Sequence, residues 1–205
     1  MTASTALGPR LPGAAIVTAA AWLGLAVLAG VTGFLVQLPF PGPQLIILAL
    51  VVAALAAGTM LPALRAWIDA LPLGLLVGVN GLRFVGIAFL VLASRGELAR
   101  AFADRAGWGD IAAATVALGL VALGNLGTPS RRLLVHAWNA FGALDLVVAV
   151  GTATWVTLNH VTPGVEPVLS WPLSVVPLFF VPILFANHVF IFRRLRAASE
   201  VTDGR

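Results

Sequence analysis

Two charged residues, Arg83 and Asp145, lie inside long apolar stretches of this 205-residue chain. Arg83 follows about 11 residues of the stretch 72–93, so a transmembrane helix with a rise of about 1.5 Å per residue places it near the middle of a bilayer. An arginine at that depth costs about 2.5–3.5 kcal/mol, so we expect it to face the protein interior beside an acidic partner. Asp145 lies at a similar depth in a stretch that runs in the same direction, which makes it the expected partner.

A buried Arg–Asp pair predicts either a static clamp between two helices or a site linked to a proton or a substrate. In the second role Arg83 holds an anionic group, and Asp145 is its counter-charge or a protonatable switch. Asn80 lies one helical turn before Arg83, while Trp138 and Asn139 lie about two turns before Asp145. These five residues form the predicted ligand-binding or buried polar site. The leading hypothesis is a small transporter or a ligand-binding membrane protein.

Two histidines support an alternative chemistry. His136 stands near the start of one apolar stretch and His188 near the end of the next, so antiparallel neighbouring helices bring them to similar depth. Facing axial histidines are what a b-type haem requires, and the same pair also suits proton transfer. This pattern predicts a haem-containing or quinone-linked membrane electron carrier. A third hypothesis is a non-catalytic accessory subunit of a membrane complex.

The composition disfavours several classes of function. The chain has no cysteine and no lysine, which excludes thiolate nucleophiles, thiolate metal sites and Schiff-base cofactors. Signatures of a nucleophile elbow, a His-Glu-x-x-His zinc site and a phosphate-binding loop are also missing. We therefore predict no catalytic residue and no metal site, and an enzyme is the less favoured class. The net charge of +4 does not indicate nucleic-acid binding, because the arginines flank apolar segments as membrane topology requires.

The elements that position these residues are six apolar segments. Only 10% of the residues are charged, too few for a water-facing surface, and a membrane-spanning helix needs about 20 apolar residues. The sequence predicts an all-α, polytopic membrane helix bundle forming one transmembrane domain over residues 1–205, with a polar tail at 197–205. The predicted spans are residues 14–38, 44–64, 72–93, 111–126, 133–158 and 171–192.

Arginine placement predicts the orientation of the bundle. With the N-terminus inside, eight arginines are cytoplasmic and three are external, which favours both termini in the cytoplasm of a bacterium and the chain in its inner membrane. Residues 96–110 predict a short external amphipathic helix lying in the interface, with Asp110 capping the fourth span. The expected partners are lipid and a small molecule or ion, and the sequence leaves a homo-oligomer open.

Three segments carry a resemblance to other proteins. They read GLRFVG at 81–86, AGWGD at 106–110 and WNAFGALDL at 138–146. In these the chain resembles a set of small bacterial integral membrane proteins of about six helices that have no established activity. The resemblance covers most of the third to sixth spans. It implies a membrane helix bundle and brings no function with it.

Overall fold

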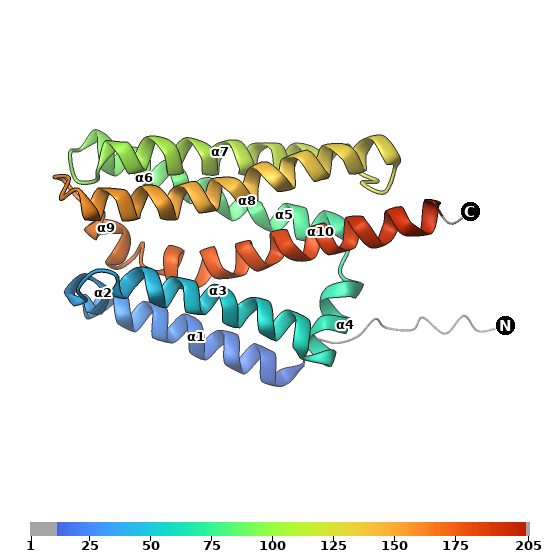
Figure 1. Cartoon of the computed structure of the whole chain (residues 1–205), viewed down its shortest axis with the longest axis horizontal. Helices are drawn as coiled ribbons and strands as arrows, with labels where there is room; N and C mark the ends of the chain where they lie inside the picture. The colour runs from blue at the N-terminus through green and yellow to red at the C-terminus, as the bar shows by residue number, and fades with distance from the viewer. Residues whose placement is uncertain (1–11, 204–205) are drawn as a thin grey trace.

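The computed structural model describes residues 12–203, and its regular elements there are helices (Figure 1). Six helical stretches are long and apolar enough to cross a membrane, which confirms the predicted all-α, six-span fold. Their chain directions alternate, so the start of the first and the end of the sixth lie at the same end of the molecule. The spans are Gly13–Val31 (α1), Gly42–Met60 (α3), Leu73–Ser94, Arg100–Leu123 (α7), Pro129–Leu158 (α8) and Val176–Ala197.

The third span is not a uniform α-helix. It consists of α5 (Leu73–Gly78), a 3-10 segment η1 (Val79–Val85) and α6 (Gly86–Ser94). The change of helix type coincides with Asn80, whose side-chain amide donates hydrogen bonds of 3.2 Å to the carbonyls of Leu76 and Val77. An asparagine that bonds the preceding turn competes with the regular helical ladder. Arg83 therefore lies on an irregular part of the backbone near mid-membrane.

The sixth span is also irregular where it begins. A π-helical turn, η2 (Val176–Phe180), leads into α10 (Val181–Asp203). Because Pro182 has no N–H, the carbonyl of Leu178 cannot accept a helical bond from it. That carbonyl accepts a 2.8 Å hydrogen bond from the indole Nε1 of Trp22 in α1. A backbone group freed by proline is thus satisfied by a neighbouring helix, as the lipid interior demands.

The spans form two groups, which we call the body and the hairpin. The body consists of the third to sixth spans. In it α7 packs against η1, α6 and α8, and α10 packs against α8. The hairpin consists of α1 and α3, joined through the short helix α2 (Phe34–Gln37), and α3 packs along α10. Figure 1 shows the hairpin on one side of α10, with α6, α7 and α8 on the other. The polar residues of the predicted site all belong to the body.

The prediction of an external helix over residues 96–110 is wrong. These residues include a short loop and the first half of α7, which runs without interruption from Arg100 to Leu123 and has Ala99 as its N-cap. Small buried residues at helical spacing, such as Ala103 and Gly107, continue the inward face of the span through this part. Arg100, Asp104 and Arg105 are exposed on the other face, whereas Asp110 is buried. Asp110 therefore lies in the interior of a span and caps no helix.

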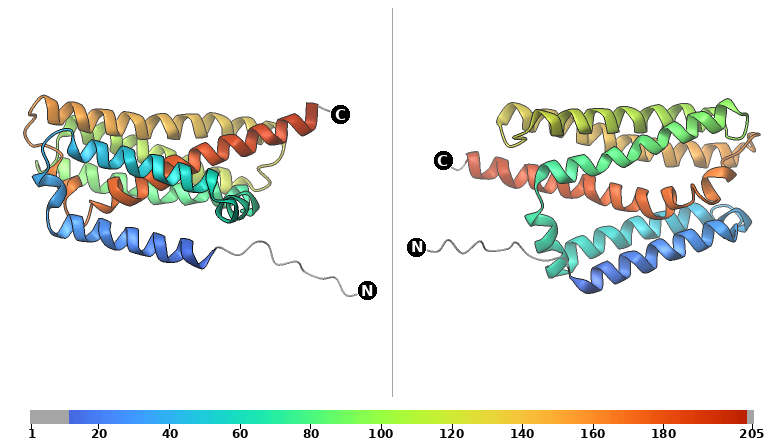
Figure 2. Two further views of the ribbon diagram at one scale, coloured as in Figure 1. Left: turned by 60° about the horizontal axis from the view of Figure 1, so that its bottom comes forward. Right: turned by 180° about the vertical axis from the view of Figure 1, so that it is seen from behind.

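The second predicted span, residues 44–64, extends beyond the end of the helix that the structure shows. α3 stops at Met60, and Pro62 starts a separate helix, α4 (Pro62–Ala70), because a proline ends one helix and suits the first position of the next. Figure 2 shows α4 running across the bundle. Ile68 packs against Phe190, while Asp69 pairs with Arg193 of α10. α10 itself continues through the predicted tail as far as Asp203, and residues 204–205 lie outside the described part.

Candidate functional site

Arg83 is the centre of a buried ionic cluster formed by side chains from four spans. Its side chain is 1% exposed. The Nε group donates to Oδ1 of Asp110 on α7 at 2.7 Å, and Nη2 donates to Oδ2 of Asp145 on α8. Nη1 donates to the backbone carbonyl of Gly142 at 3.0 Å. The predicted Arg83–Asp145 contact is confirmed. Arg83 also pairs with a second carboxylate, that of Asp110.

His188 of α10 closes the cluster on its fourth side. Its Nε2 lies 3.4 Å from Nη1 of Arg83, and its Nδ1 lies 2.8 Å from Oδ1 of Asn139. An arginine only donates, so Nε2 is the acceptor and Nδ1 carries the proton donated to Asn139. Asn139 returns a bond of 2.9 Å to the backbone carbonyl of His188. Trp138 packs its ring 5.6 Å from that imidazole and donates to the carbonyl of Ala113 at 2.9 Å.

Glycines allow the helices to approach closely enough for these contacts. A Cβ on Gly109 would overlap the carboxylate of Asp145, and one on Gly142 would lie 2.6 Å from Cε1 of His188. Between α6 and α7, a Cβ on Gly86 would lie 2.6 Å from the carbonyl oxygen of Gly107. Small residues at helix interfaces permit this close packing in membranes. The space that Gly142 leaves beside Asp145 is filled by Arg83 and His188.

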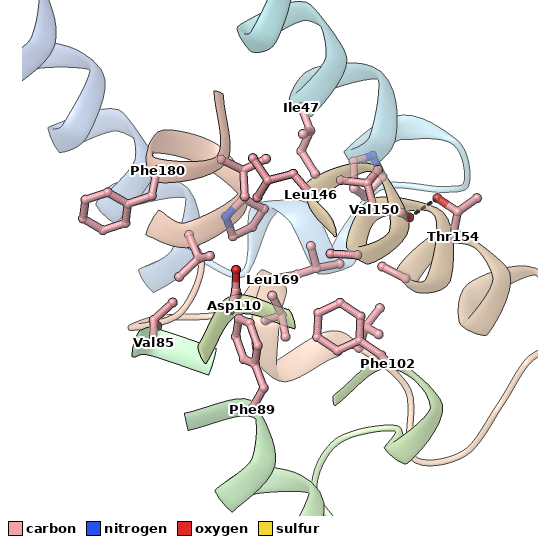
Figure 3. Close-up of a pocket in the computed structure, with 18 of the residues that line it drawn as sticks. Ile47, Val85, Phe89, Phe102, Asp110, Leu146, Val150, Thr154, Leu169 and Phe180 are labelled. Carbon is pink, nitrogen blue, oxygen red and sulfur yellow. Dashed lines mark hydrogen bonds between the residues drawn. The ribbon is translucent and has the colours of Figure 1, made fainter. Parts of the chain in front are cut away.

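A cavity of about 90 Å³ adjoins the cluster. Arg83 and Asp110 both line it, and its other walls are almost entirely apolar. Figure 3 shows a carboxylate oxygen of Asp110 directed into the ring of apolar side chains. Both irregular backbone segments contribute, η1 through Val85 and η2 through residues such as Phe180. The cluster thus has one face that a bound molecule can reach.

Most of the predicted site residues meet in this cluster. Arg83, Asp145, Asn139 and Trp138 are linked through the contacts described above. Asn80 is fully buried on the same span, but its hydrogen bonds go to its own helix and its Oδ1 has no partner among the described residues. Asn80 therefore lies on the same span as Arg83 but makes no hydrogen bond to the described residues of the cluster.

His136 and His188 lie in different environments. His136 is exposed and stacks edge-on against Phe192 at 5.1 Å, whereas His188 is 1% exposed near the middle of its span. The predicted sixth span ended at residue 192, but α10 runs on past it, which moves His188 away from the membrane surface. Both ring nitrogens of His188 face protein groups. The structure therefore adds no observation in favour of a haem between the two histidines.

Asp110 was predicted to cap the fourth span, and the structure instead places it in the cluster. The signal that identifies it is a stripe of buried, mostly small residues at helical spacing, which runs through Asp110 on both sides. The stripe comprises Phe102, Ala103, Ala106, Gly107, Asp110, Ala113, Ala114, Ala117 and Leu120. Charged neighbours such as Asp104 and Arg105 obscure it, although they point to the opposite, exposed face.

One sequence family covers the whole cluster. The family described as Domain of unknown function (DUF8737) matches residues 40–196, which is most of the chain. The chain belongs to this family. The match includes α3 and the entire body as far as Arg196, while α1 precedes it. No curated protein and no solved structure matches the chain.

Proposed function

We propose that this protein is a small membrane transporter, or a membrane protein that binds a ligand, and that its ligand occupies the cavity beside Arg83 and Asp110. The observation that carries the proposal is the position of this charged pair on the wall of an otherwise apolar cavity inside the membrane-spanning bundle. Ionisable groups at this depth are costly to keep, and they commonly mark substrate or proton pathways. If the charged residues served only as a static clamp between helices, no cavity beside them would be needed.

The contacts of Arg83 refine its role in this proposal. Four of the five N–H groups of a guanidinium are used here, by Asp110, Asp145, the Gly142 carbonyl and His188. One N–H group remains for an anionic ligand, and two carboxylates already balance the positive charge of Arg83. We therefore assign Arg83 the task of holding the two carboxylates, and Asp110 that of meeting the ligand.

The two irregular spans favour transport over simple binding. Non-helical backbone within a membrane is tolerated where it is enclosed by protein or lines a cavity, and broken helices commonly form the substrate sites of secondary transporters. Here η1 and η2 both line the same cavity. Such segments rearrange at lower cost than a continuous helix, which suits a site that must open in turn to each side.

The orientation follows the distribution of arginines. At the end of the bundle where α10 finishes, the described residues include a group of six arginines. The positive-inside rule supports a cytoplasmic location for this end, with the chain in a bacterial inner membrane. The six are Arg65, Arg131, Arg132, Arg193, Arg194 and Arg196.

The test is purification of the full chain in mild detergent, followed by mass spectrometry of bound small molecules and an absorption spectrum. Ala149 lines the cavity, and its neighbour Val148 is exposed on the outer surface of α8. We expect a bound molecule in the wild type and in Val148→Phe, and its loss in Ala149→Phe. A molecule retained equally by both variants, or none in the wild type, contradicts the proposal.

The same preparation separates the rival functions. A Soret band that disappears in His188→Ala would support the haem protein instead. A stoichiometric protein partner, with no small molecule bound, would support an accessory subunit.

A further inference from the structure

The charges of the central cluster do not balance. Arg83 contributes one positive charge from η1, while Asp110 on α7 and Asp145 on α8 contribute two carboxylates. The facing group from α10 is His188, which is neutral in the tautomer that its hydrogen bonds require. With both carboxylates ionised the cluster has one excess negative charge near the middle of the bundle. Such a charge is costly unless a proton or another cation neutralises it.

The free side of the cluster is the one that faces the cavity. Asp145 does not line the cavity, whereas Asp110 does, and only Oδ1 of Asp110 is bonded to Arg83. Gln44 of α3 lines the same cavity, and its Oε1 is buried without a hydrogen-bond partner among residues 12–203. Two hydrogen-bond acceptors therefore stand on the cavity wall. Each of them can accept a hydrogen bond from a ligand that supplies N–H donors.

The remaining walls favour an apolar body with a positive head. Phe89, Phe102 and Phe180 line the cavity, and Figure 3 shows them arranged around it together with aliphatic side chains. Aromatic rings bind hydrocarbon and also attract ammonium groups. A metal ion is a poorer fit, because the described residues contain no group of three His, Asp or Glu side chains placed to hold one.

We propose that the cavity takes a protonated lipophilic amine, whose ammonium group pairs with Asp110 and replaces a proton otherwise carried by one of the two carboxyl groups, Asp110 or Asp145. The inference rests on the proposed function, since it requires the cavity to bind a ligand. The exchange balances in charge: one ammonium ion enters the neutral, singly protonated cluster and one proton leaves. Proton-linked uptake or release of an amine follows directly from such competition.

Two probes of nearly equal shape test this. Benzylamine is protonated at neutral pH, and ethylbenzene has a methyl group in place of the ammonium. Each is titrated by calorimetry into the full chain in mild detergent, against matched protein-free micelles. We expect benzylamine to bind the wild type, and Asp110→Asn to weaken that binding by about 30-fold or more, as when one partner of a buried charge pair is removed. Ethylbenzene binding should be the same in both proteins.

Asp104→Asn is the matched control, because Asp104 is an exposed carboxylate on the same helix. It should leave the binding of both probes unchanged. If ethylbenzene binds and benzylamine does not, the amine inference is overturned while the proposed function stands. If neither probe binds and no molecule co-purifies, the proposed function fails as well.

A second measurement needs no variant, so it stands even where Asp110→Asn does not fold. In weakly buffered solution, benzylamine binding to the wild type should release about one proton per bound amine, and the affinity should fall as the pH is lowered. Binding without proton release, at an affinity independent of pH, overturns the exchange.

Discussion

The hairpin and the body both consist of spans apolar enough to cross a membrane, yet they are built differently. Within the most apolar 18 residues of α1 and of α3, only 11% and 17% of the residues are buried inside the protein. The corresponding fraction in the sixth span is 56%. Lipid tails are as apolar as leucine, so an apolar side chain in a membrane gains little from protein cover. Polar and small residues mark which helices face one another.

Each region is held by its own kind of contact. The body is organised around buried charges, with glycines that bring α7, α8 and α10 close to them. The hairpin is attached by the packing of α3 along α10, by the Trp22 bond to the Leu178 carbonyl, and by the close approach of Gly30 to Ser174 just before the sixth span. We therefore expect substitutions in the body to be the more costly, in the following order.

Arg83→Ala should have the largest effect. It leaves two buried carboxylates without their cation, and breaking a buried pair in this way costs about 3–5 kcal/mol. We expect little folded protein, measured as the monodisperse yield on size exclusion and by thermal unfolding in detergent. Arg105→Ala, at an exposed position on α7, is the control.

A rescue variant sharpens this test. Adding Asp110→Asn and Asp145→Asn to Arg83→Ala removes the unpaired charges, and part of the folded yield should return. A wild-type yield from Arg83→Ala alone would mean that the body is not organised around this residue.

Gly109→Ala should have the next largest effect. Its methyl group would overlap the carboxylate of Asp145 and push it away from Arg83, and overpacking of this kind costs about 1–3 kcal/mol. Gly119 lies on the same helix with nothing within 4 Å of an added Cβ. Gly119→Ala should therefore leave the thermal midpoint unchanged or raise it slightly. Equal effects of the two substitutions would contradict the close packing of α7 on α8.

Asn139→Ala removes both hydrogen bonds that connect α8 with His188. It leaves the Nδ1–H of His188 buried without an acceptor, and we expect a loss of about 1–2 kcal/mol in the free energy of unfolding. Asn159→Ala, at the exposed end of α8, is the control. The free energy of unfolding is measured from detergent-based denaturation curves, and a loss as small as that of the control would show that the body tolerates a missing polar contact.

Gly30→Ala tests the hairpin and should have the smallest effect. Its methyl group would overlap the Ser174 hydroxyl and lie 2.8 Å from Cβ of Ser174, so the turn before the sixth span has to shift slightly, and we expect a loss of about 1 kcal/mol. Gly24→Ala on the same helix meets open space and should have no effect. If Gly30→Ala destabilises the protein as much as Gly109→Ala does in the same thermal assay, the distinction between hairpin and body fails.

The sequence predicted those parts of the site that follow from the depth of a residue within its membrane span. Arg83 and Asp145 were paired correctly because each lies far from the ends of an apolar span, and an arginine at that depth needs a partner. Asp110 was missed because charged neighbours on the exposed face of α7 placed the start of the span too late. His188 was placed too near the surface for the converse reason, since α10 continues beyond the predicted end.

The sequence by itself determined that this is a six-span membrane protein with a buried Arg–Asp pair, because hydropathy and the cost of a charge in lipid depend on local composition. Only the tertiary structure decided that a second carboxylate and a histidine join that pair, and that a cavity adjoins it. Those features depend on the rotation of each helix about its axis and on how closely glycines such as Gly109 and Gly142 let the backbones approach. Neither quantity is set by the residues of one helix alone.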